Sequence, residues 1–198
     1  MYKIVGKRLL APDIYLMDIE APRIAKSANP GQFIIVMADE KGERIPLTIC
    51  DYDEDKGTVT IVFQTLGHST KKMAEYQVGD FFSDFVGPLG QPSELLSQDV
   101  EELKDMKILF VAGGVGTAPV YPQVKMLHSN GIKADVIVGT RTKDMLILED
   151  EMKEVAGELY ITTDDGSYGF NGMVTDKMND LIKNQGKKYD HVVAIGPM

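Results

Sequence analysis

A glycine-rich turn between an apolar strand and a helix is the feature that most constrains the fold of this chain. An apolar run at residues 107–112 is followed by Gly113-Gly114-Val115-Gly116, and a helical pattern then runs over 117–129. Gly114 and Gly116 would let the backbone approach a ligand without an intervening Cβ. The helix start offers free N–H groups and the positive end of its dipole to an anion. We expect Thr117 to cap this helix, with Pro119 in its first turn.

The turn differs from the common dinucleotide-binding pattern G-x-G-x-x-G, because Pro119 stands where the third glycine would be. The next strand also ends in Gly139-Thr140-Arg141 rather than in an acidic residue. Taken alone, the turn is a weak signal, and a tight turn with a purely structural role is the alternative. The neighbouring segments therefore have to decide between the two interpretations.

From about Leu103 onward, apolar strands alternate with helical patterns. Strands are expected at 107–112, 134–139, 158–162 and 191–195, and helices at 117–129, 148–155 and 174–184. This alternation is typical of a parallel sheet with helices on its faces. The sequence therefore predicts a C-terminal α/β parallel-sheet domain over 99–198, with the domain boundary lying within residues 91–104.

The first 98 residues have a different pattern, with short strands and few helical signals. Val59, Ile61 and Phe63 alternate with polar residues, as in a strand with one buried face. Further strands are expected at 14–20, 32–37 and 81–86, separated by glycine and proline turns. Regularly spaced short strands favour a small closed barrel, because closure removes exposed edges. We expect an N-terminal antiparallel Greek-key β-barrel over residues 1–98.

Composition excludes several classes of protein. The net charge of −9, with 21 basic residues among 30 acidic ones, provides no basic surface for nucleic acid. The longest apolar runs, 33–38 and 108–112, are far shorter than the roughly 20 residues that span a bilayer. Lys3, Lys7 and Arg8 interrupt any signal-peptide apolar stretch. A protein that is soluble, cytoplasmic and not bound to membrane or nucleic acid is expected.

Cysteine and histidine usage argues against a metal site in this chain. Cys50 is the single cysteine, which excludes an internal disulfide and a cysteine-ligated iron–sulfur cluster within these residues. Three histidines, His68, His128 and His191, are too dispersed to suggest a metal-ligand cluster. No metal site is therefore predicted.

The segment Arg44-Ile45-Pro46-Leu47-Thr48 resembles the R-x-P-x-[S/T] segment of the ferredoxin-NADP reductase superfamily, which lies on a barrel strand against the flavin. Arg44 offers a cationic fork for a pyrophosphate, Pro46 and Leu47 an apolar wall for a ring system, and Thr48 a hydrogen bond near the flavin N5. An exposed arginine before an ordinary barrel strand is the alternative.

A second segment resembles the other flavin-binding part of that superfamily, a strand followed by a loop and a helix start. In it, Gly67, Ser69 and Thr70 would present N–H groups and hydroxyls to the FAD phosphates. His68 is interpreted as a loop residue, since hydride transfer needs no histidine. The strand that precedes this loop supplies the remaining predicted flavin contacts, Val62, Phe63 and Gln64.

The resemblance covers nearly the whole chain. Five segments occur in the family's order: 44–48, 62–70, 87–90, 113–119 and 163–167. The pattern is similar in particular to the electron-transfer subunit of dihydroorotate dehydrogenase and to the small subunit of NADH-dependent ferredoxin:NADP oxidoreductase, also known as a sulfide dehydrogenase subunit. The resemblance implies FAD on the barrel and NAD(H) or NADP(H) on the sheet domain. The residues that would surround the nicotinamide nucleotide are Gly114, Val115, Gly116, Thr117, Arg141, Asp164, Asp165, Gly166, Gly196, Pro197 and Met198.

The choice of nucleotide stays open at this point. Arg141 could contact a ribose 2′-phosphate, which favours NADP, or be a solvated loop charge compatible with NAD. The resemblance favours NAD(H). Relatives carry a C-terminal segment whose cysteines hold a [2Fe-2S] cluster, and the final strand here runs into Gly196-Pro197-Met198. We therefore expect a chain truncated at its C-terminus.

The resemblance implies an NAD(P)H-dependent flavin oxidoreductase subunit. Hydride would pass between the nicotinamide and the flavin, and electrons would then pass to a larger flavin and iron–sulfur subunit, in a complex of the ferredoxin:NADP oxidoreductase type. Thr48 is the residue expected to tune the flavin N5 through a hydrogen bond. One alternative is an electron-transfer subunit serving dihydroorotate oxidation. Another, of a different class, is a non-catalytic module that binds a nucleotide.

Overall fold

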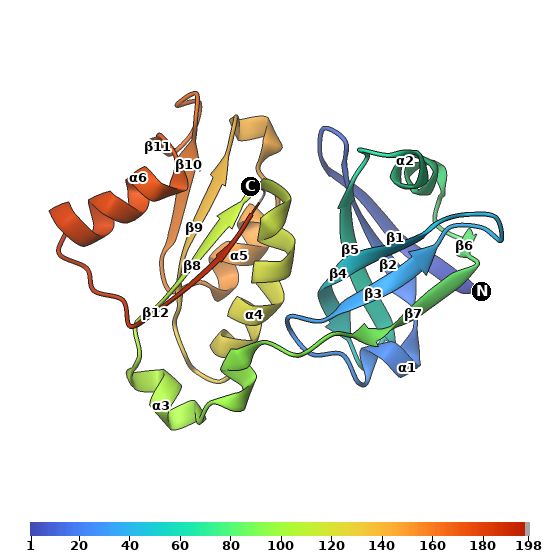
Figure 1. The fold of residues 1–198 in the computed structure, drawn as a ribbon, viewed down its shortest axis with the longest axis horizontal. Helices are drawn as coiled ribbons and strands as arrows, with labels where there is room; N and C mark the ends of the chain where they lie inside the picture. The colour runs from blue at the N-terminus through green and yellow to red at the C-terminus, as the bar shows by residue number, and fades with distance from the viewer. Residues whose placement is uncertain (197–198) are drawn as a thin grey trace. The chain divides into compact units, whose positions relative to one another are not determined.

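The computed structural model describes residues 1–196, which divide into two units (Figure 1). The first, Met1–Ser93, is called the barrel unit below, and the second, which begins at Glu94, the sheet unit. The sequence predicted a barrel over residues 1–98 with the boundary within residues 91–104, and the contacts of the structure divide the chain after Ser93. Each unit has a hydrophobic core of its own.

The barrel unit is built from seven antiparallel strands. They are β1 (Tyr2–Ala11), β2 (Ile14–Glu20), β3 (Phe33–Met37), β4 (Arg44–Asp53), β5 (Thr58–Gln64), β6 (Phe81–Phe82) and β7 (Asp84–Leu89). Their order in the sheet is β6-β1-β2-β5-β4-β3-β7. Only Ser83 separates β6 from β7, so the segment that pairs with β1 continues directly into the strand that pairs with β3. The two ends of the sheet are thereby joined, and the predicted antiparallel barrel is confirmed as a nearly closed one.

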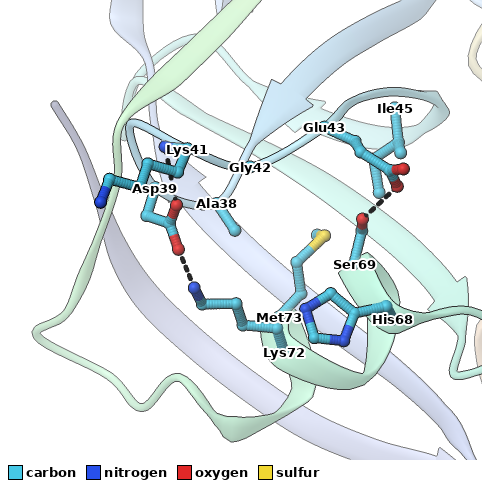
Figure 2. Close-up of a pocket in the computed structure, with 10 residues that line it drawn as sticks. All are labelled: Ala38, Asp39, Lys41, Gly42, Glu43, Ile45, His68, Ser69, Lys72 and Met73. Carbon is cyan, nitrogen blue, oxygen red and sulfur yellow. Dashed lines mark hydrogen bonds and ion pairs between the residues drawn. The ribbon is translucent and has the colours of Figure 1, made fainter.

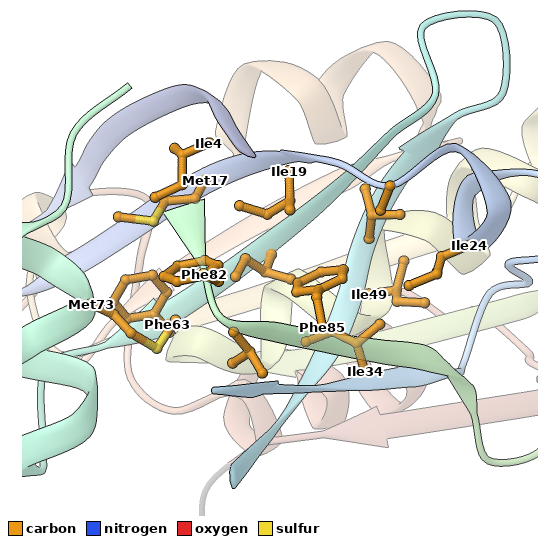
Figure 3. Close-up of a cluster of buried hydrophobic side chains, with 14 of the residues drawn as sticks. Ile4, Met17, Ile19, Ile24, Ile34, Ile49, Phe63, Met73, Phe82 and Phe85 are labelled. Atoms are coloured by element: carbon orange, nitrogen blue, oxygen red, sulfur yellow. The ribbon is translucent and has the colours of Figure 1, made fainter. Parts of the chain in front are cut away.

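Side chains that alternate along the strands fill the barrel (Figure 3). Ile61 and Phe63 of β5 point inward together with Ile49 of β4, and all three are buried. Two short helices add to this core. They are α1 (Pro22–Ala25), which contributes Ile24, and α2 (His68–Glu75), which contributes Met73. Because Met73 is anchored in the core, the position of α2 is fixed relative to the strands.

Strand β1 was not predicted, because its charged residues obscure the alternation. Ile4 is fully buried on the core side, while Lys3 and Arg8 are exposed. Lys7 has a specific role, since its ammonium donates to the carbonyls of Ala74 and Tyr76 at 2.7 Å each. These carbonyls lie at the C-terminal end of α2, where a cation is favourable.

The sheet unit contains five parallel strands and confirms the predicted α/β arrangement. The strands are β8 (Ile108–Gly113), β9 (Asp135–Thr140), β10 (Leu159–Thr163), β11 (Phe170–Asn171) and β12 (His191–Ile195), in the order β11-β10-β9-β8-β12. The α-helices are α3 (Val100–Asp105), α4 (Thr117–Ser129), α5 (Glu149–Val155) and α6 (Val174–Asn179). Shorter 3₁₀ turns are η1 (Glu94–Ser97), η2 (Gly114–Gly116) and η3 (Lys143–Met145), and a π-helical turn, η4 (Asp180–Asn184), extends α6.

Helices cover both faces of this sheet (Figure 1). Phe110 of β8 belongs to a core that includes Val124 of α4 and Met152 of α5. Leu109 on the same strand points to the opposite face, where Leu181 of η4 packs. Because β8, β9 and β10 are parallel, their carboxyl ends lie at the same edge of the sheet. None of the helices within residues 1–196 is both long and apolar enough to cross a membrane.

Candidate functional site

The beginning of β4 presents one set of side chains outward and another to the barrel core. Arg44, Pro46 and Thr48 alternate along the strand and so share its outer face. Ile45 and Leu47 instead pack against the barrel core. Arg44, Pro46 and Thr48 are thus brought together as predicted, whereas Leu47 lies on the opposite face and does not join Pro46 in an outer wall.

Arg44 is held by an ion pair to a neighbouring strand. Its Nη1 lies 2.6 Å from Oδ2 of Asp84, and about half of the arginine side chain is exposed. The two residues flank Met37 of β3 in register, Arg44 on one side and Asp84 on the other. The guanidinium therefore stands at the end of β4 with an anionic partner that the sequence did not indicate.

The end of β5 runs toward the start of β4, because the two strands are antiparallel and Ile61 pairs with Ile49. Phe63 points into the core, where it stacks on Tyr15 with ring centroids 6.0 Å apart. Val62 is also buried, and Gln64 is half-buried. Of the three predicted contacts on this strand, Phe63 is committed to the barrel core, and Gln64 leads into the loop that follows.

This loop ends in the first turn of α2, which has the features of an anion-binding helix start. The Gly67 N–H donates to the Thr70 hydroxyl at 3.1 Å, and that hydroxyl donates back to the Gly67 carbonyl. A Cβ added at Gly67 would meet nothing within 4 Å, so the space in front of the turn is open. The first N–H groups of a helix have no partner within it and favour an anion.

Ser69 does not point into empty solvent. Its hydroxyl donates to Oε2 of Glu43 at 2.6 Å, which links α2 to the connection between β3 and β4. A second link is the ion pair of Lys72 with Asp39. Neither acidic residue was predicted as part of the site. They lie 26 and 33 positions from their partners, and no local pattern relates them.

A pocket of about 360 Å³ lies between these two segments (Figure 2). Residues 38–45 form one wall, and the first two turns of α2 form the other. Ile45 and Met73 supply apolar surface, while Glu43 and Ser69 supply polar groups. Ser69 is the one lining residue that the sequence had assigned to a cofactor.

In the sheet unit, the predicted glycine turn forms the short η2 turn between β8 and α4. Gly114 has a left-handed φ of 53°, a conformation that glycine adopts at low cost. The expected cap by Thr117 is wrong. Gly116 has helical dihedrals, so Thr117 lies inside the helix and its hydroxyl donates to the Gly114 carbonyl at 2.9 Å. Pro119 lies in the first turn, as expected, and Val115 completes η2.

Gly116 is needed for close packing against the end of β12. A Cβ there would lie 2.4 Å from the Ile195 carbonyl oxygen. A Cβ at Gly196 would lie 3.3 Å from the Gly113 Cα. The glycine turn and Gly196 are therefore adjacent, and they flank the point between β8 and β12 where the strand order reverses. Ligands of open α/β sheets bind at this switch point. Pro197 and Met198 lie outside the described residues.

The loops after β9 and β10 are joined by their backbones. The Asp164 N–H donates to the Thr140 carbonyl at 3.1 Å, and the Asp165 N–H donates to the Arg141 carbonyl at 3.2 Å. The Lys143 N–H donates to the Ser167 hydroxyl at 2.9 Å. Arg141, Asp164, Asp165 and Gly166 thus come together, all exposed, at the carboxyl edge of the sheet.

Ser167 holds the carboxylate of Asp165 in place at this edge of the sheet. Its N–H and its hydroxyl both donate to Oδ1 of Asp165, at 2.9 and 2.6 Å. These two hydrogen bonds lower the pKa of the Asp165 carboxyl below its usual value. Asp165 is therefore a fixed negative charge at neutral pH, and its N–H is bonded to the carbonyl of Arg141, which carries a positive charge.

The described residues contain no metal site that the sequence overlooked. Among residues 1–196, no three His, Cys, Asp or Glu side chains are grouped so as to hold a metal ion. Cys50 is buried on β4. Two groups of residues remain as candidate sites: the first turn of α2 with Arg44 on the barrel unit, and the glycine turn with the loops after β9 and β10 on the sheet unit.

Comparison with known proteins gives consistent matches. Residues 110–198 match the family model described as the oxidoreductase NAD-binding domain. An uncharacterised protein from the adh 3′ region of Clostridium beijerinckii is 63% identical over 198 residues, which is all of this chain and 67% of that protein. A homologue of the dihydroorotate dehydrogenase B (NAD(+)) electron transfer subunit from Thermotoga maritima is 40% identical over 98% of this chain and 66% of its own length. The corresponding subunit from Fusobacterium nucleatum is 34% identical over 96% of this chain and 72% of its own length.

Solved structures agree with these matches. The structure of an NADH-dependent reduced ferredoxin-NADP oxidoreductase superposes with a TM-score of 0.87 at 39% identity, over 100% of this chain and 68% of the other. Phthalate dioxygenase reductase, at 19% identity and a TM-score of 0.69 over 99% of this chain and 60% of the other, shares the fold. The chain spans about two thirds of the length of the first relatives.

Proposed function

The chain belongs to the ferredoxin-NADP reductase-like superfamily, among the electron-transfer subunits of dihydroorotate dehydrogenase B and their homologues, and from this premise we propose that it carries electrons from NADH to FAD. The observation that carries the proposal is that one chain contains two sites suited to binding a phosphate group. One is the open first turn of α2 next to Arg44, and the other is the glycine turn at the switch point of the sheet.

The residues of the barrel unit fit a flavin dinucleotide. Arg44 has the planar fork that suits a pyrophosphate, and the start of α2 offers unpartnered N–H groups together with the Thr70 hydroxyl. Thr48 lies four residues further along the same strand face, about 13 Å at the usual rise of a strand. This spacing separates a phosphate-binding end from a ring-binding end, where Pro46 and Thr48 would contact the flavin ring.

When bound, the flavin would supply the redox chemistry, accepting a hydride and releasing electrons singly. The protein's own contribution is to bind and orient. Thr48 would place a hydroxyl at the ring, where it can donate or accept a hydrogen bond, and Arg44 would fix the far end. No side chain of this chain has to react covalently.

The sheet unit fits the nicotinamide nucleotide. Gly116 packs so closely on Ile195 that any Cβ would disrupt the turn, and Gly114 gives the backbone its left-handed bend. The space beside Gly114, where a Cβ would lie, is open, which leaves room for a phosphate at the start of α4, a helix of 13 residues. Arg141 and the acidic pair Asp164 and Asp165 would lie at the ribose end, on the adjacent loops.

We further propose that electrons leave this chain for a larger partner subunit. The dihydroorotate dehydrogenase B relatives are named as electron transfer subunits, and the similar solved structure is that of a ferredoxin-NADP oxidoreductase. The two assignments differ in the partner and not in the chemistry on this chain. The single cysteine, Cys50, is buried, so these residues cannot supply the thiolates of a [2Fe-2S] cluster.

The test is a visible spectrum of the purified chain with FAD, followed by anaerobic titration with NADH and, separately, with NADPH. Retention of FAD and bleaching of its visible band by NADH are expected. Protein that stays colourless with excess FAD would contradict the flavin assignment and leave a nucleotide-binding module without redox chemistry. Retained FAD that neither nucleotide bleaches would contradict the assignment of the sheet unit.

A further inference from the structure

We propose that Tyr168 and Glu149 form a latch that joins the loop after β10 to the start of α5, and that this latch holds the nucleotide-binding edge of the sheet unit in shape before a nucleotide arrives. The inference rests on the proposed function, since its main measure is the affinity for NADH. It goes beyond that function by giving a positioning role to two residues that were not among the predicted site residues. The β10 loop below means residues 164–169, and the β9 loop means residues 141–148.

The β10 loop is a compact turn closed by Thr163. The hydroxyl of Thr163 accepts from the Tyr168 N–H at 3.1 Å and donates to the Tyr168 carbonyl at 2.8 Å. The carbonyl of Thr163 also accepts from the N–H groups of Gly166 and Gly172, at 3.2 and 3.1 Å. Because Thr163 is fully buried at the end of β10, the turn is tied to the sheet. A contact that holds Tyr168 therefore also restrains the exposed residues before it, which include Asp165.

The side chain of Tyr168 crosses from this turn to the neighbouring segment. Its hydroxyl donates to Oε1 of Glu149, the first residue of α5, at 2.8 Å. The ammonium of Lys143, in the β9 loop, lies 4.8 Å from the centroid of the Tyr168 ring, within the range of a cation–π contact. The hydroxyl and the ring are thus both engaged by residues of the β9 loop and of the helix that follows it.

Glu149 is an anchor whose position does not depend on Tyr168. It directly follows Leu148, which is buried and has a left-handed φ of 56°. A residue with a Cβ keeps such a conformation only where the surrounding structure imposes it. One turn further along α5, Nζ of Lys153 lies 2.7 Å from the same Oε1 of Glu149. The carboxylate is therefore fixed by its own helix and offers a preset acceptor to the phenol.

Both groups have the protonation state that the bond needs at neutral pH. Burial would raise the pKa of Glu149, but hydrogen bonds from Lys153 and Tyr168 lower it below its usual value. The bond to Glu149 raises the pKa of Tyr168 above its usual value. The carboxylate is therefore ionised and the phenol protonated, and a hydrogen bond to an ionised acceptor is stronger than one between neutral groups.

The latch supplements three other links between the two loops. The backbone bonds from Asp164 and Asp165 are 3.1 and 3.2 Å long, at the long end of the usual range. The third link ends on the hydroxyl of Ser167. Water can compete for these groups, because all three residues are exposed. If the loops separate for part of the time, only the joined fraction binds the nucleotide, and the apparent affinity falls by that fraction. The latch raises the joined fraction.

The experiment measures NADH binding to the complete chain prepared without FAD, by the fluorescence of NADH, so that no hydride transfer follows binding. Tyr168→Phe keeps the ring and removes only the hydroxyl, and it is expected to raise the Kd about three- to tenfold. Glu149→Ala should have the same effect. The double variant should be no weaker than either single variant, because both break one contact.

Two further variants sharpen the comparison. Glu149→Gln keeps an oxygen acceptor and should recover part of the affinity that Glu149→Ala loses. Asp150→Ala removes the exposed neighbouring acid on α5 and is the matched control, so its Kd should stay within about twofold of the wild-type value.

Hydrogen exchange of the nucleotide-free chain, followed by NMR, gives a readout that does not depend on binding. In Tyr168→Phe, the amides of Asp165 and Lys143 should exchange about three- to tenfold faster, while the amides of β8 and β9 exchange as in the wild-type protein. Faster exchange across the whole sheet unit would overturn the inference, since the tyrosine would then only support the fold.

An unchanged Kd or unchanged exchange in Tyr168→Phe would also overturn it. So would additive effects of Tyr168→Phe and Glu149→Ala on the Kd, because Tyr168 would then contact the nucleotide independently of Glu149. Wild-type protein that binds no NADH would overturn the proposed function. The exchange of the two loop amides would still decide whether the latch holds the loops together.

Discussion

Arg44 and Asp84 form an ion pair, Nη1 to Oδ2 at 2.6 Å, across the two sides of Met37 on β3. The arginine that the sequence assigned to a pyrophosphate therefore already has an anionic partner within the chain. Both side chains are partly exposed, at 55% for Arg44 and 29% for Asp84. A cofactor phosphate at Arg44 would have to compete with this carboxylate.

Asp84→Asn is expected to tighten FAD binding by up to about fivefold. An exposed ion pair is worth about 0.2–1 kcal/mol, and the neutral amide would release that amount to the competing phosphate. Titration of the FAD-free protein with FAD measures the change. Arg44→Gln should have the opposite effect. Weaker FAD binding in Asp84→Asn would mean that Asp84 positions the guanidinium for its ligand and does not compete with it.

Thr48→Ala is expected to slow bleaching of the flavin by NADH about three- to tenfold. The variant removes a single hydroxyl, whose hydrogen bond is worth about 0.5–1.5 kcal/mol. Thr48 is half-buried on the outer face of β4, so the change leaves the barrel core intact. Stopped-flow absorbance at the flavin band gives the rate. Thr48→Ser keeps the hydroxyl and should retain most of the wild-type bleaching rate. An unchanged rate and spectrum in Thr48→Ala would remove Thr48 from the site.

Gly116→Ala is expected to weaken NADH binding at least about tenfold. The new methyl group would lie 2.4 Å from the Ile195 carbonyl oxygen, so the turn or the end of β12 must move. FAD binding to the barrel unit should not change. Gly131→Ala is the control. Gly131 has a left-handed φ of 77°, which Gly116 does not share, so alanine there strains the backbone, but the space around its Cβ is open. Equal losses in the two variants would indicate general destabilisation.

Local patterns in the sequence predicted most of the fold. The helix over 117–129 and the strand over 14–20 have the expected bounds, because apolar periodicity and flanking turn residues act over a few positions. Strand β1 was missed because its charges are satisfied at a distance, with Lys7 bonded to carbonyls more than 60 positions away. The prediction that Thr117 caps α4 was wrong because a 3₁₀ turn runs directly into α4.

The site was less predictable than the fold. The motif residues identified where phosphates could bind, but the groups that surround them come from other parts of the chain. Asp84 lies 40 positions from Arg44, and Glu43 lies 26 from Ser69. Such pairs depend on the register of β3 with both β4 and β7. The pocket is likewise formed only when 38–45 and α2 meet.

At the other edge of the sheet unit, Asp135 joins several partners in one network. Its carboxylate accepts hydrogen bonds from Lys187 at 2.9 Å and from the Tyr189 hydroxyl at 2.8 Å. Burial alone would lower the pKa of Lys187, but its hydrogen bonds to Tyr160 and Asp135 raise it well above the usual value. Burial and the bond to Asp135 raise the pKa of Tyr189 in the same direction.

Both groups are therefore protonated more readily in the folded state than in the unfolded state. The resulting stability is fully present below about pH 10, the ordinary pKa range of these groups, and is lost as the pH rises above it. Asp135→Asn should lower the free energy of unfolding by about 1–2 kcal/mol at pH 8. Denaturant unfolding should show that the difference in free energy of unfolding between the wild-type protein and Asp135→Asn is smaller at pH 11 than at pH 8. Glu154→Gln, which changes an exposed acid on α5, is the control. If the effect of Asp135→Asn on the free energy of unfolding were the same at pH 8 and pH 11, the role given to the Asp135 network would be contradicted.

Preference for NADH over NADPH is expected from the charges on the two joined loops that follow β9 and β10. Arg141 by itself would favour a 2′-phosphate, but the structure attaches Asp164 and Asp165 to the backbone of the same loop. Ser167 keeps Asp165 charged by lowering its pKa. Two carboxylates against one guanidinium leave a net negative charge where the additional phosphate of NADPH would lie.

The double variant Asp164→Asn, Asp165→Asn should therefore raise the NADPH-to-NADH ratio of kcat/KM at least about tenfold, mainly through KM for NADPH. Added salt should raise the same ratio in the wild-type protein, because screening weakens the repulsion. Asp150→Asn, whose side chain is 95% exposed on α5, controls for net charge. The opposite result is equally informative. If wild-type protein prefers NADPH and Arg141→Ala abolishes that preference, Arg141 holds the 2′-phosphate and the acidic pair does not determine the nucleotide.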